Sequence, residues 1–177
     1  MEVAPVLVGG VLLLATYRRF PLSNLAYVLI WCHAIILIVG GHWTYAEMPL
    51  FDWLKDAWSL QRNYYDRVGH VAQGFVPAIL AREILLRTSP LTPGKWLNTI
   101  VVAICLAVSA SYELIEWWAA ILLNEGADQF LATQGDPWDT QWDMFLALCG
   151  AITSLLLLHR LHDRSMKNLS AHAAPSE

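Results

Sequence analysis

The sequence has little charge for a chain of its length. Only 15% of its 177 residues are Asp, Glu, Lys or Arg, whereas 56% are hydrophobic, and the mean hydropathy is +0.44. This balance excludes an ordinary soluble globular domain and predicts an integral membrane protein. The net charge of -4 leaves no basic surface, so a nucleic-acid partner is not expected.

Cysteine is also scarce, and the familiar catalytic signatures are missing. The three thiols, Cys32, Cys105 and Cys149, each lie inside an apolar run, where a thiol behaves as a small core residue. We therefore expect neither a disulfide nor a Cys-based metal site. The chain has no Gly-rich phosphate loop, no Gly-x-Ser-x-Gly turn, no His-Glu-x-x-His and no Cys-x-x-Cys. An activated water is a more natural nucleophile for such a chain than a serine.

Apolar runs, by contrast, are abundant, and several approach the roughly 20 residues that a membrane-spanning helix needs. There are five, of which the first is short: 3–17, 25–43, 68–86, 96–123 and 142–161. We predict an all-α polytopic bundle of about five transmembrane helices, with residues 1–164 in a single domain. The first run ends at Arg18-Arg19 without a signal-peptide cleavage site and is expected to stay attached.

Lysine and arginine are unevenly distributed among the connecting segments, which sets the expected orientation. Eight of them gather on what would be one side of the membrane: Arg18, Arg19, Arg82, Arg87, Lys95, Arg160, Arg164 and Lys167. The loop at 124–141, on the other side, has four acids and neither Lys nor Arg. The positive-inside rule then predicts an outer N-terminus and a cytoplasmic C-terminus.

Two further segments have distinctive composition. At about 49–64, aromatic and apolar residues interleave with acids and a lysine, which is typical of an amphipathic helix lying in the headgroup plane of the bilayer. Such a helix is either a lid over a site or an interfacial anchor, and the anchor is the simpler interpretation. The tail at 165–177 is small, polar and Pro-containing, so we expect it to be disordered in the cytoplasm.

Ionisable residues interrupt three of the five runs at what would be the same depth. They form three pairs at helical spacing, namely Asp66 with His70, Glu113 with Glu116, and Asp139 with Asp143. Such groups are costly inside a membrane and by default mark function. We expect all six to converge near the outer surface, where so many carboxylates require a divalent metal, shared protons, or partner cations such as Arg62 and Arg67.

The metal alternative is supported by the donor set. Imidazole and carboxylate groups are ligands for Zn, Mn, Mg or Fe. The candidate metal ligands are His70, Glu113, Glu116, Asp139 and Asp143. In catalysis, His70 would be a ligand or a general base oriented by Asp66, and Glu116 a further acid or base.

Other polar residues have simpler interpretations. Asp136 precedes a proline and is expected to be a helix N-cap. Arg82 and Glu83 are expected to be a snorkelling pair at the cytoplasmic end of the third span. His159 and His162 follow the fifth span beside arginines, as a basic cytoplasmic flank.

Three motifs in this order resemble a known family. Residues 66–70 (Asp-Arg-Val-Gly-His), 112–118 (Tyr-Glu-Leu-Ile-Glu-Trp-Trp) and 135–144 (Gly-Asp-Pro-Trp-Asp-Thr-Gln-Trp-Asp-Met) resemble the YjdF-type bacterial inner-membrane proteins, a family defined by a domain of unknown function. More distantly, the chain is similar to the VanZ-like membrane proteins, although Glu116 and Ala147 stand where that pattern tends to have Gln and Asn. The resemblance implies a fold and a location rather than a reaction.

Three kinds of function follow from these observations. The first is a metal- or carboxylate-assisted hydrolase or transferase that acts on a lipid or lipid-linked headgroup. The second is a non-enzymatic protein that binds or transports a cation or a cationic solute. The third is a structural polar network that fixes helix packing. Few acids lie in the predicted cytoplasmic half and few bases lie near the carboxylates, so the sequence favours the enzyme.

Overall fold

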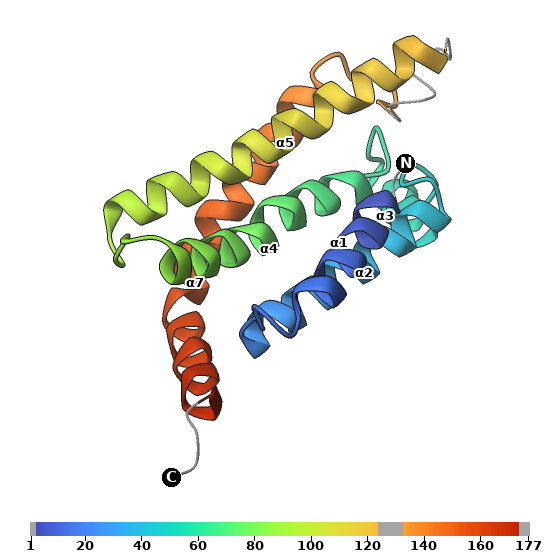
Figure 1. Cartoon of the computed structure of the whole chain (residues 1–177). Helices are drawn as coiled ribbons and strands as arrows, with labels where there is room; N and C mark the ends of the chain where they lie inside the picture. The colour runs from blue at the N-terminus through green and yellow to red at the C-terminus, as the bar shows by residue number, and fades with distance from the viewer. Residues whose placement is uncertain (1–2, 124–132, 174–177) are drawn as a thin grey trace.

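A computed structural model describes residues 3–123 and 133–173 of the chain, and every regular element in these ranges is an α-helix (Figure 1). These helices are α1 (Ala4–Thr16), α2 (Asn24–His42), α3 (Pro49–Trp58), α4 (Tyr65–Thr88), α5 (Lys95–Leu123) and α7 (Asp139–Ala173). Five of them cover the predicted spans, and α3 lies within the predicted amphipathic segment. The predicted all-α fold is confirmed.

The helices differ in how well they suit a membrane. Among the described residues, α2, α5 and α7 are long and apolar enough to cross a bilayer. The α1 helix has 13 residues and is shorter than a full span, as its sequence implied. The α4 helix is not among these three, and it carries charged residues near both of its ends. The five-span arrangement and the orientation of the termini stay predictions.

The α4 helix is the centre of the bundle. It lies between α2 on one side and α5 and α7 on the other (Figure 1). Ala78 belongs to a core shared with α5 and α7, which includes Leu97 and Leu155, whereas Ile79 packs against Ala26 of α2. Because neighbouring helices rather than lipid cover much of α4, its charged residues can be buried in protein.

Glycines set the close crossing of α4 and α7. A Cβ atom on Gly74 would collide with the backbone carbonyl of Ala147, and one on Gly150 would collide with the carbonyl oxygen of Val71. Membrane helices approach closely where small residues face each other. This crossing brings Asp143, one turn before Ala147, beside the N-terminal half of α4.

The C-terminal end of α7 differs from the sequence-based expectation. The helix continues to Ala173, whereas a disordered tail was expected from residue 165. No proline or glycine interrupts the chain between Ser165 and Ala173, and the Ser165 hydroxyl accepts a hydrogen bond from the backbone N–H of Leu25 (3.1 Å). Residues 174–177 of that expected tail lie outside the described residues.

Candidate functional site

Two arginines near the start of α4 bind the acids at the start of α7. Arg62, which precedes α4 and is buried, donates hydrogen bonds to Asp66 (2.6 Å) and to Asp139 (2.6 Å). Arg67 donates to the same Asp139 oxygen (2.6 Å) and also to Asp143. Partner cations, one of the three alternatives considered for this cluster, therefore compensate much of its negative charge.

Asp136 has the capping role that its position before a proline predicted. Its Oδ1 atom accepts a hydrogen bond from the backbone N–H of Trp138 (2.9 Å), and α7 begins at Asp139. The other carboxylate oxygen lies 3.2 Å from Arg67. The cap thus also belongs to the arginine–aspartate cluster. The other two acids of the loop at 124–141 that precede it, Glu125 and Asp128, lie outside the described residues.

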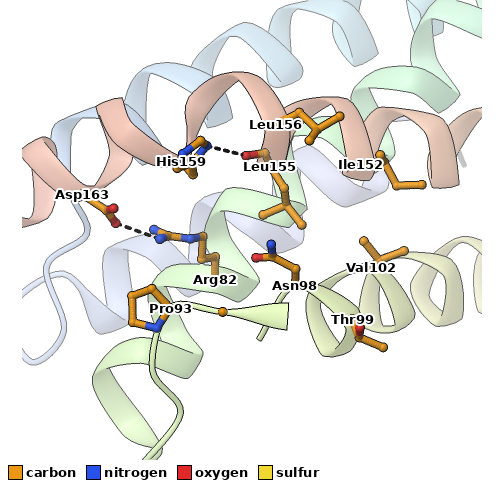
Figure 2. A pocket seen from close by; sticks show the side chains of 11 residues that line it. Arg82, Pro93, Asn98, Thr99, Val102, Ile152, Leu155, Leu156, His159 and Asp163 are labelled. Atoms are coloured by element: carbon orange, nitrogen blue, oxygen red, sulfur yellow. Dashed lines mark hydrogen bonds and ion pairs between the residues drawn. The ribbon is translucent and has the colours of Figure 1, made fainter. Parts of the chain in front are cut away.

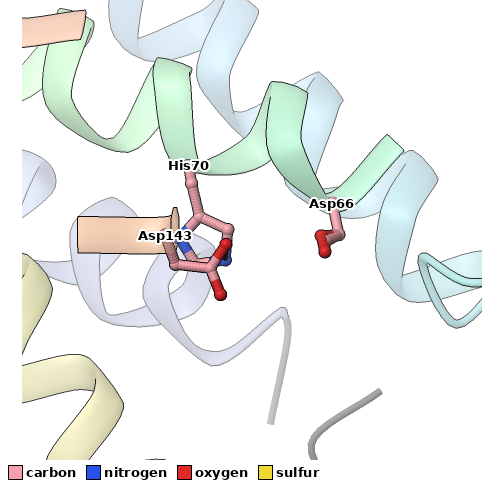
Figure 3. Close-up of side chains that lie close together, drawn as sticks. All are labelled: Asp66, His70 and Asp143. Carbon is pink, nitrogen blue, oxygen red and sulfur yellow. Dashed lines mark ion pairs between the residues drawn. The ribbon is translucent and has the colours of Figure 1, made fainter. Parts of the chain in front are cut away.

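Asp66, His70 and Asp143 form the group whose geometry suits a metal ion. One ligand atom from each lies within 4.8 Å of the other two. Asp66 and His70 extend from one face of α4 toward Asp143 on α7 (Figure 3), where His70 Nε2 is 3.5 Å from Asp143 Oδ1. Asp66 Oδ1 and His70 Nδ1 are buried without a hydrogen-bond partner among the described residues. Buried polar atoms are nearly always paired, so these two are candidates for binding a ligand.

A cavity of about 1020 Å³ opens beside this group, between α2, α4, α5 and α7. Its lining includes all six ionisable residues singled out in the sequence: Asp66, His70, Glu113, Glu116, Asp139 and Asp143. The expected convergence of the three pairs is therefore present in the structure. Their assignment as ligands or catalytic groups stays a prediction.

The acids of α5 lie on a different wall of the cavity. Glu113 interacts with the hydroxyl of Thr140, while its Oε1 atom is buried without a partner among the described residues. Glu116 lines the cavity one turn further along α5. Within the described part of the chain, neither glutamate joins the three-residue group that is close enough to share a metal, and neither does Asp139.

No hydrogen bond joins Asp66 to His70, so the predicted orientation of His70 by Asp66 has no direct contact to support it. Asp66 Oδ2 accepts a hydrogen bond from Arg62. The acid within ion-pair distance of His70 is Asp143. This arrangement follows from the α4–α7 crossing, because Asp143 lies on the facing helix whereas Asp66 lies one turn away on the same helix. Sequence spacing alone does not distinguish the two acids.

Side chains from two loops join at Gln134, which lines the cavity, and no pattern in the sequence indicated this contact. The Asn63 backbone N–H donates to Gln134 Oε1 (3.0 Å), and Gln134 Nε2 donates to the Asn63 carbonyl (3.1 Å). The Asn63 side chain donates to Met48 O (3.0 Å) and to Asp52 Oδ1 (3.1 Å). These bonds tie α3 to the loop before α7. Amide side chains that bind distant backbone leave no spacing pattern in a sequence.

The charged side chains of α3 are exposed or half-buried, unlike those of the arginine–aspartate cluster. Lys55 donates a hydrogen bond to Asp52 (3.0 Å), and this contact holds the pKa of the Asp52 carboxyl below its usual value. The α3 helix buries none of its residues, and its aromatic side chains Trp53 and Trp58 are exposed. These features suit a helix at the membrane surface, and whether it acts as a lid or as an anchor stays a prediction.

The opposite end of α4 holds a second polar network, which corrects two sequence-based interpretations. Arg82 is 2% exposed and Glu83 is 0% exposed, so they are buried in protein rather than snorkelling. His162 is also fully buried, between Arg82 (2.8 Å) and Glu83 (3.0 Å). An arginine can only donate, so His162 Nδ1 accepts and its Nε2–H donates to Glu83. The backbone N–H of Ser23 and the Arg87 side chain donate to the other Glu83 oxygen.

Comparisons with known proteins agree with the resemblance that the motifs suggested. A family model described as a predicted membrane protein (DUF2238) matches residues 1–164. The chain is 53% identical over 167 residues to the inner membrane protein YjdF of Escherichia coli (strain K12), which covers 94% of this chain and 80% of that protein. No solved structure matches the chain.

Proposed function

This chain belongs to the DUF2238 family of predicted membrane proteins and is an inner-membrane protein, and we propose that it is a hydrolase or transferase for a lipid or lipid-linked headgroup. One observation carries the proposal. Asp66 Oδ1, His70 Nδ1 and Glu113 Oε1 are buried without partners among the described residues, and all three side chains line one cavity. A purely structural network would pair such atoms, because each unpaired buried group costs stability.

The cavity supports a lipid-derived substrate by its size and its walls. Its volume of about 1020 Å³ is at the upper end of typical small-molecule sites, which hold roughly 300–1,000 Å³. Leu114 and Trp117 of α5 line it and are also 50% and 53% exposed. A headgroup can therefore reach the polar residues while its acyl chains stay against the apolar surface of α5.

The side chains around the cavity have separate roles in the proposed reaction. Arg62 and Arg67 hold the carboxylates of Asp66 and Asp143 in place. His70 lies between these acids and is the group best placed to take a proton from an attacking water. Glu113, on the facing wall, is placed to donate or accept a proton at the leaving group.

A divalent metal fits the three-residue group formed by Asp66, His70 and Asp143. Two of these residues have unpartnered buried atoms, and imidazole with two carboxylates suits Zn, Mn, Mg or Fe. When bound, the ion would act as a Lewis acid on the scissile group. Arg67 already neutralises Asp143, so a cation would share that carboxylate with the guanidinium.

A structural role is the second candidate, because one specific observation favours it. Arg62 and Arg67 together pair with four carboxylates: Asp66, Asp136, Asp139 and Asp143. From the sequence, too few basic residues were expected near these carboxylates to pair with all of them. A transporter of cations is less favoured, because Glu83 at the opposite end is completely buried and bonded through both oxygens, and Asp163 there is paired with Arg82.

The test of the enzyme is a lipid profile before and after incubation with the purified protein. Proteoliposomes made from a bacterial inner-membrane lipid extract are analysed by mass spectrometry. Wild-type protein should change the headgroup of at least one lipid or lipid-linked species, and His70→Ala should slow this change by about 100-fold or more, as expected for loss of an acid–base group. His42→Ala is the matched control, since His42 is exposed and does not line the cavity.

Metal content separates the two candidate functions further. The same preparations, with Asp143→Asn added, are measured for bound Zn, Mn, Mg and Fe by elemental mass spectrometry. A metal near one equivalent in wild type and His42→Ala, but lost in His70→Ala and Asp143→Asn, would support the metal-assisted reaction. A lipid profile that is identical for wild type and His70→Ala would refute the enzyme and leave the structural role.

A further inference from the structure

A second cavity, of about 480 Å³, lies at the opposite end of the bundle between α4, α5 and α7. One side of it is polar, with Arg82, Asn98, Thr99 and Asp163, and Figure 2 shows Arg82 reaching from α4 toward Asp163 on α7. The other side is apolar: Val102, Ile152, Leu155 and Leu156. It shares no residue with the cavity around His70.

Arg82 is the buried cation of this cavity, and one of its donors is unused. Its side chain is 3% exposed. One terminal nitrogen meets His162 Nδ1 (2.8 Å) and the other meets Asp163 Oδ1 (2.8 Å), whereas Nε has no partner among the described residues. Asp163 is 39% exposed, so its carboxylate is partly solvated. A buried guanidinium with a free N–H favours an additional acceptor, above all an anionic one.

The N-terminus of α5 lies on the same cavity and has the same preference. The helix begins at Lys95, runs for 29 residues and has no acidic residue in its first turn. Gly94, which precedes it and lines the cavity, has no side chain that could cap the first amides. Free backbone N–H groups and the helix dipole both favour an anion at this position.

The apolar side of the cavity indicates what carries the anion. Ile152 and Leu156 of α7 line the cavity and are also 42% and 70% exposed. In a membrane protein this surface meets acyl chains. A free phosphate would use none of it, whereas a phospholipid would place its phosphate near Arg82 and its glycerol and first acyl carbons against these side chains.

We propose that this cavity binds the headgroup of an anionic phospholipid, with the phosphate between Arg82 and the N-terminus of α5. The binding is independent of the proposed reaction, because it involves a different cavity at the other end of α4. Lys95, which is exposed and follows the cavity-lining Gly94, adds positive charge nearby and disfavours a cationic headgroup such as choline. The bound lipid would hold α4, α5 and α7 together in one leaflet.

Native mass spectrometry of the delipidated, detergent-purified protein tests this proposal. Wild type is offered equal amounts of phosphatidylglycerol and phosphatidylcholine, and it should retain the anionic lipid in about tenfold excess, because both lipids offer a phosphate but only phosphatidylcholine brings a second cation close to Arg82. Asn98→Asp and Thr99→Glu add a negative charge to the cavity wall and should lower that retention about tenfold. Both positions are exposed, so the fold should survive, as the thermal midpoint will show.

Thr88→Glu is the matched control, because Thr88 is exposed at the same end of the bundle but does not line the cavity. It should retain the anionic lipid as wild type does. Equal retention of the two lipids by wild type, or unchanged retention by the Asn98 and Thr99 variants, would overturn the proposal. Displacement of the lipid by excess inorganic phosphate would also overturn it, since the apolar side would then contribute nothing to binding.

Discussion

The two ends of α4 bury charge in opposite ways. At the end near Arg87, Glu83 is completely buried, and hydrogen bonds from Ser23, Arg87 and His162 satisfy both of its oxygens. At the other end, buried atoms of Asp66, His70 and Glu113 have no partner among the described residues, and a cavity of about 1020 Å³ lies beside them. The difference shows that burial of ionisable groups does not by itself indicate function. A carboxylate with both oxygens paired stabilises a fold, whereas unpaired groups beside a cavity cost stability and are available to a ligand.

The largest expected effect is the destabilisation caused by Glu83→Gln. The amide cannot accept from all three donors, so at least one buried N–H loses its partner. Breaking a buried ion pair costs about 3 kcal/mol of unfolding free energy, which lowers the thermal midpoint of a chain of this size by about 8 °C. Asp56→Asn, the same change at an exposed acid, is the control. Equal midpoints for the two variants would show that the network does not stabilise the bundle.

The crossing of α4 and α7 joins the two ends, and Gly74→Ala and Gly150→Val should disturb both. Each new Cβ meets a backbone carbonyl that cannot rotate away, so we expect a loss of about 2 kcal/mol in unfolding free energy. The variants should also lose activity at the His70 cavity, because Asp143 moves away from α4. Gly9→Ala is the control, since a Cβ there meets nothing within 4 Å. Unchanged melting of the two crossing variants would contradict the close packing.

A smaller effect of opposite sign is expected for Glu113→Gln. Its Oε1 atom is buried without a partner among the described residues, so replacing the buried carboxyl by a neutral amide should raise the unfolding free energy by about 1 kcal/mol. The proposed lipid reaction should slow at the same time. Thermal melting compares this variant directly with Glu83→Gln. Similar destabilisation by both would mean that Glu113 is as fully paired as Glu83.

The smallest effect is expected from Gln134→Ala, which removes the two hydrogen bonds between Gln134 and the Asn63 backbone. The loss of about 1 kcal/mol should be local. Hydrogen exchange should become faster in α3 and in the segment just after it, while the thermal midpoint changes little. Gln141→Ala, at an exposed position of α7, is the control. Unchanged exchange in α3 would show that this pair does not hold α3 against the loop before α7.

Helix positions followed closely from the apolar runs. The runs at 25–43 and 96–123 became Asn24–His42 and Lys95–Leu123, because bilayer thickness dictates the length of an apolar helix. The α4 and α7 helices begin at Tyr65 and Asp139, three residues before their apolar runs. The first turn of each helix contains polar residues, and the search for apolar runs left these residues out. The helical extension of α7 to Ala173 was missed for the same reason.

The candidate site was also partly visible in the sequence. All six ionisable residues that interrupt the runs line one cavity, because pairs at helical spacing share a face. Their partners were not visible. Arg62 binds Asp139 across 77 residues, and His162 binds Glu83 across 79. The sequence therefore showed Arg82 and Glu83 as an ordinary membrane-edge pair, although they are buried.

The sequence by itself determined that the chain is an all-α membrane protein, which residues form its helices, and which ionisable side chains share a face. These properties depend on local periodicity and on the cost of polar groups in lipid. Only the tertiary structure decided which buried charges are paired and which face a cavity. That outcome depends on where helices cross, and the crossing of α4 and α7 is set by contacts of Gly74 and Gly150 with backbone more than 70 residues away in the chain.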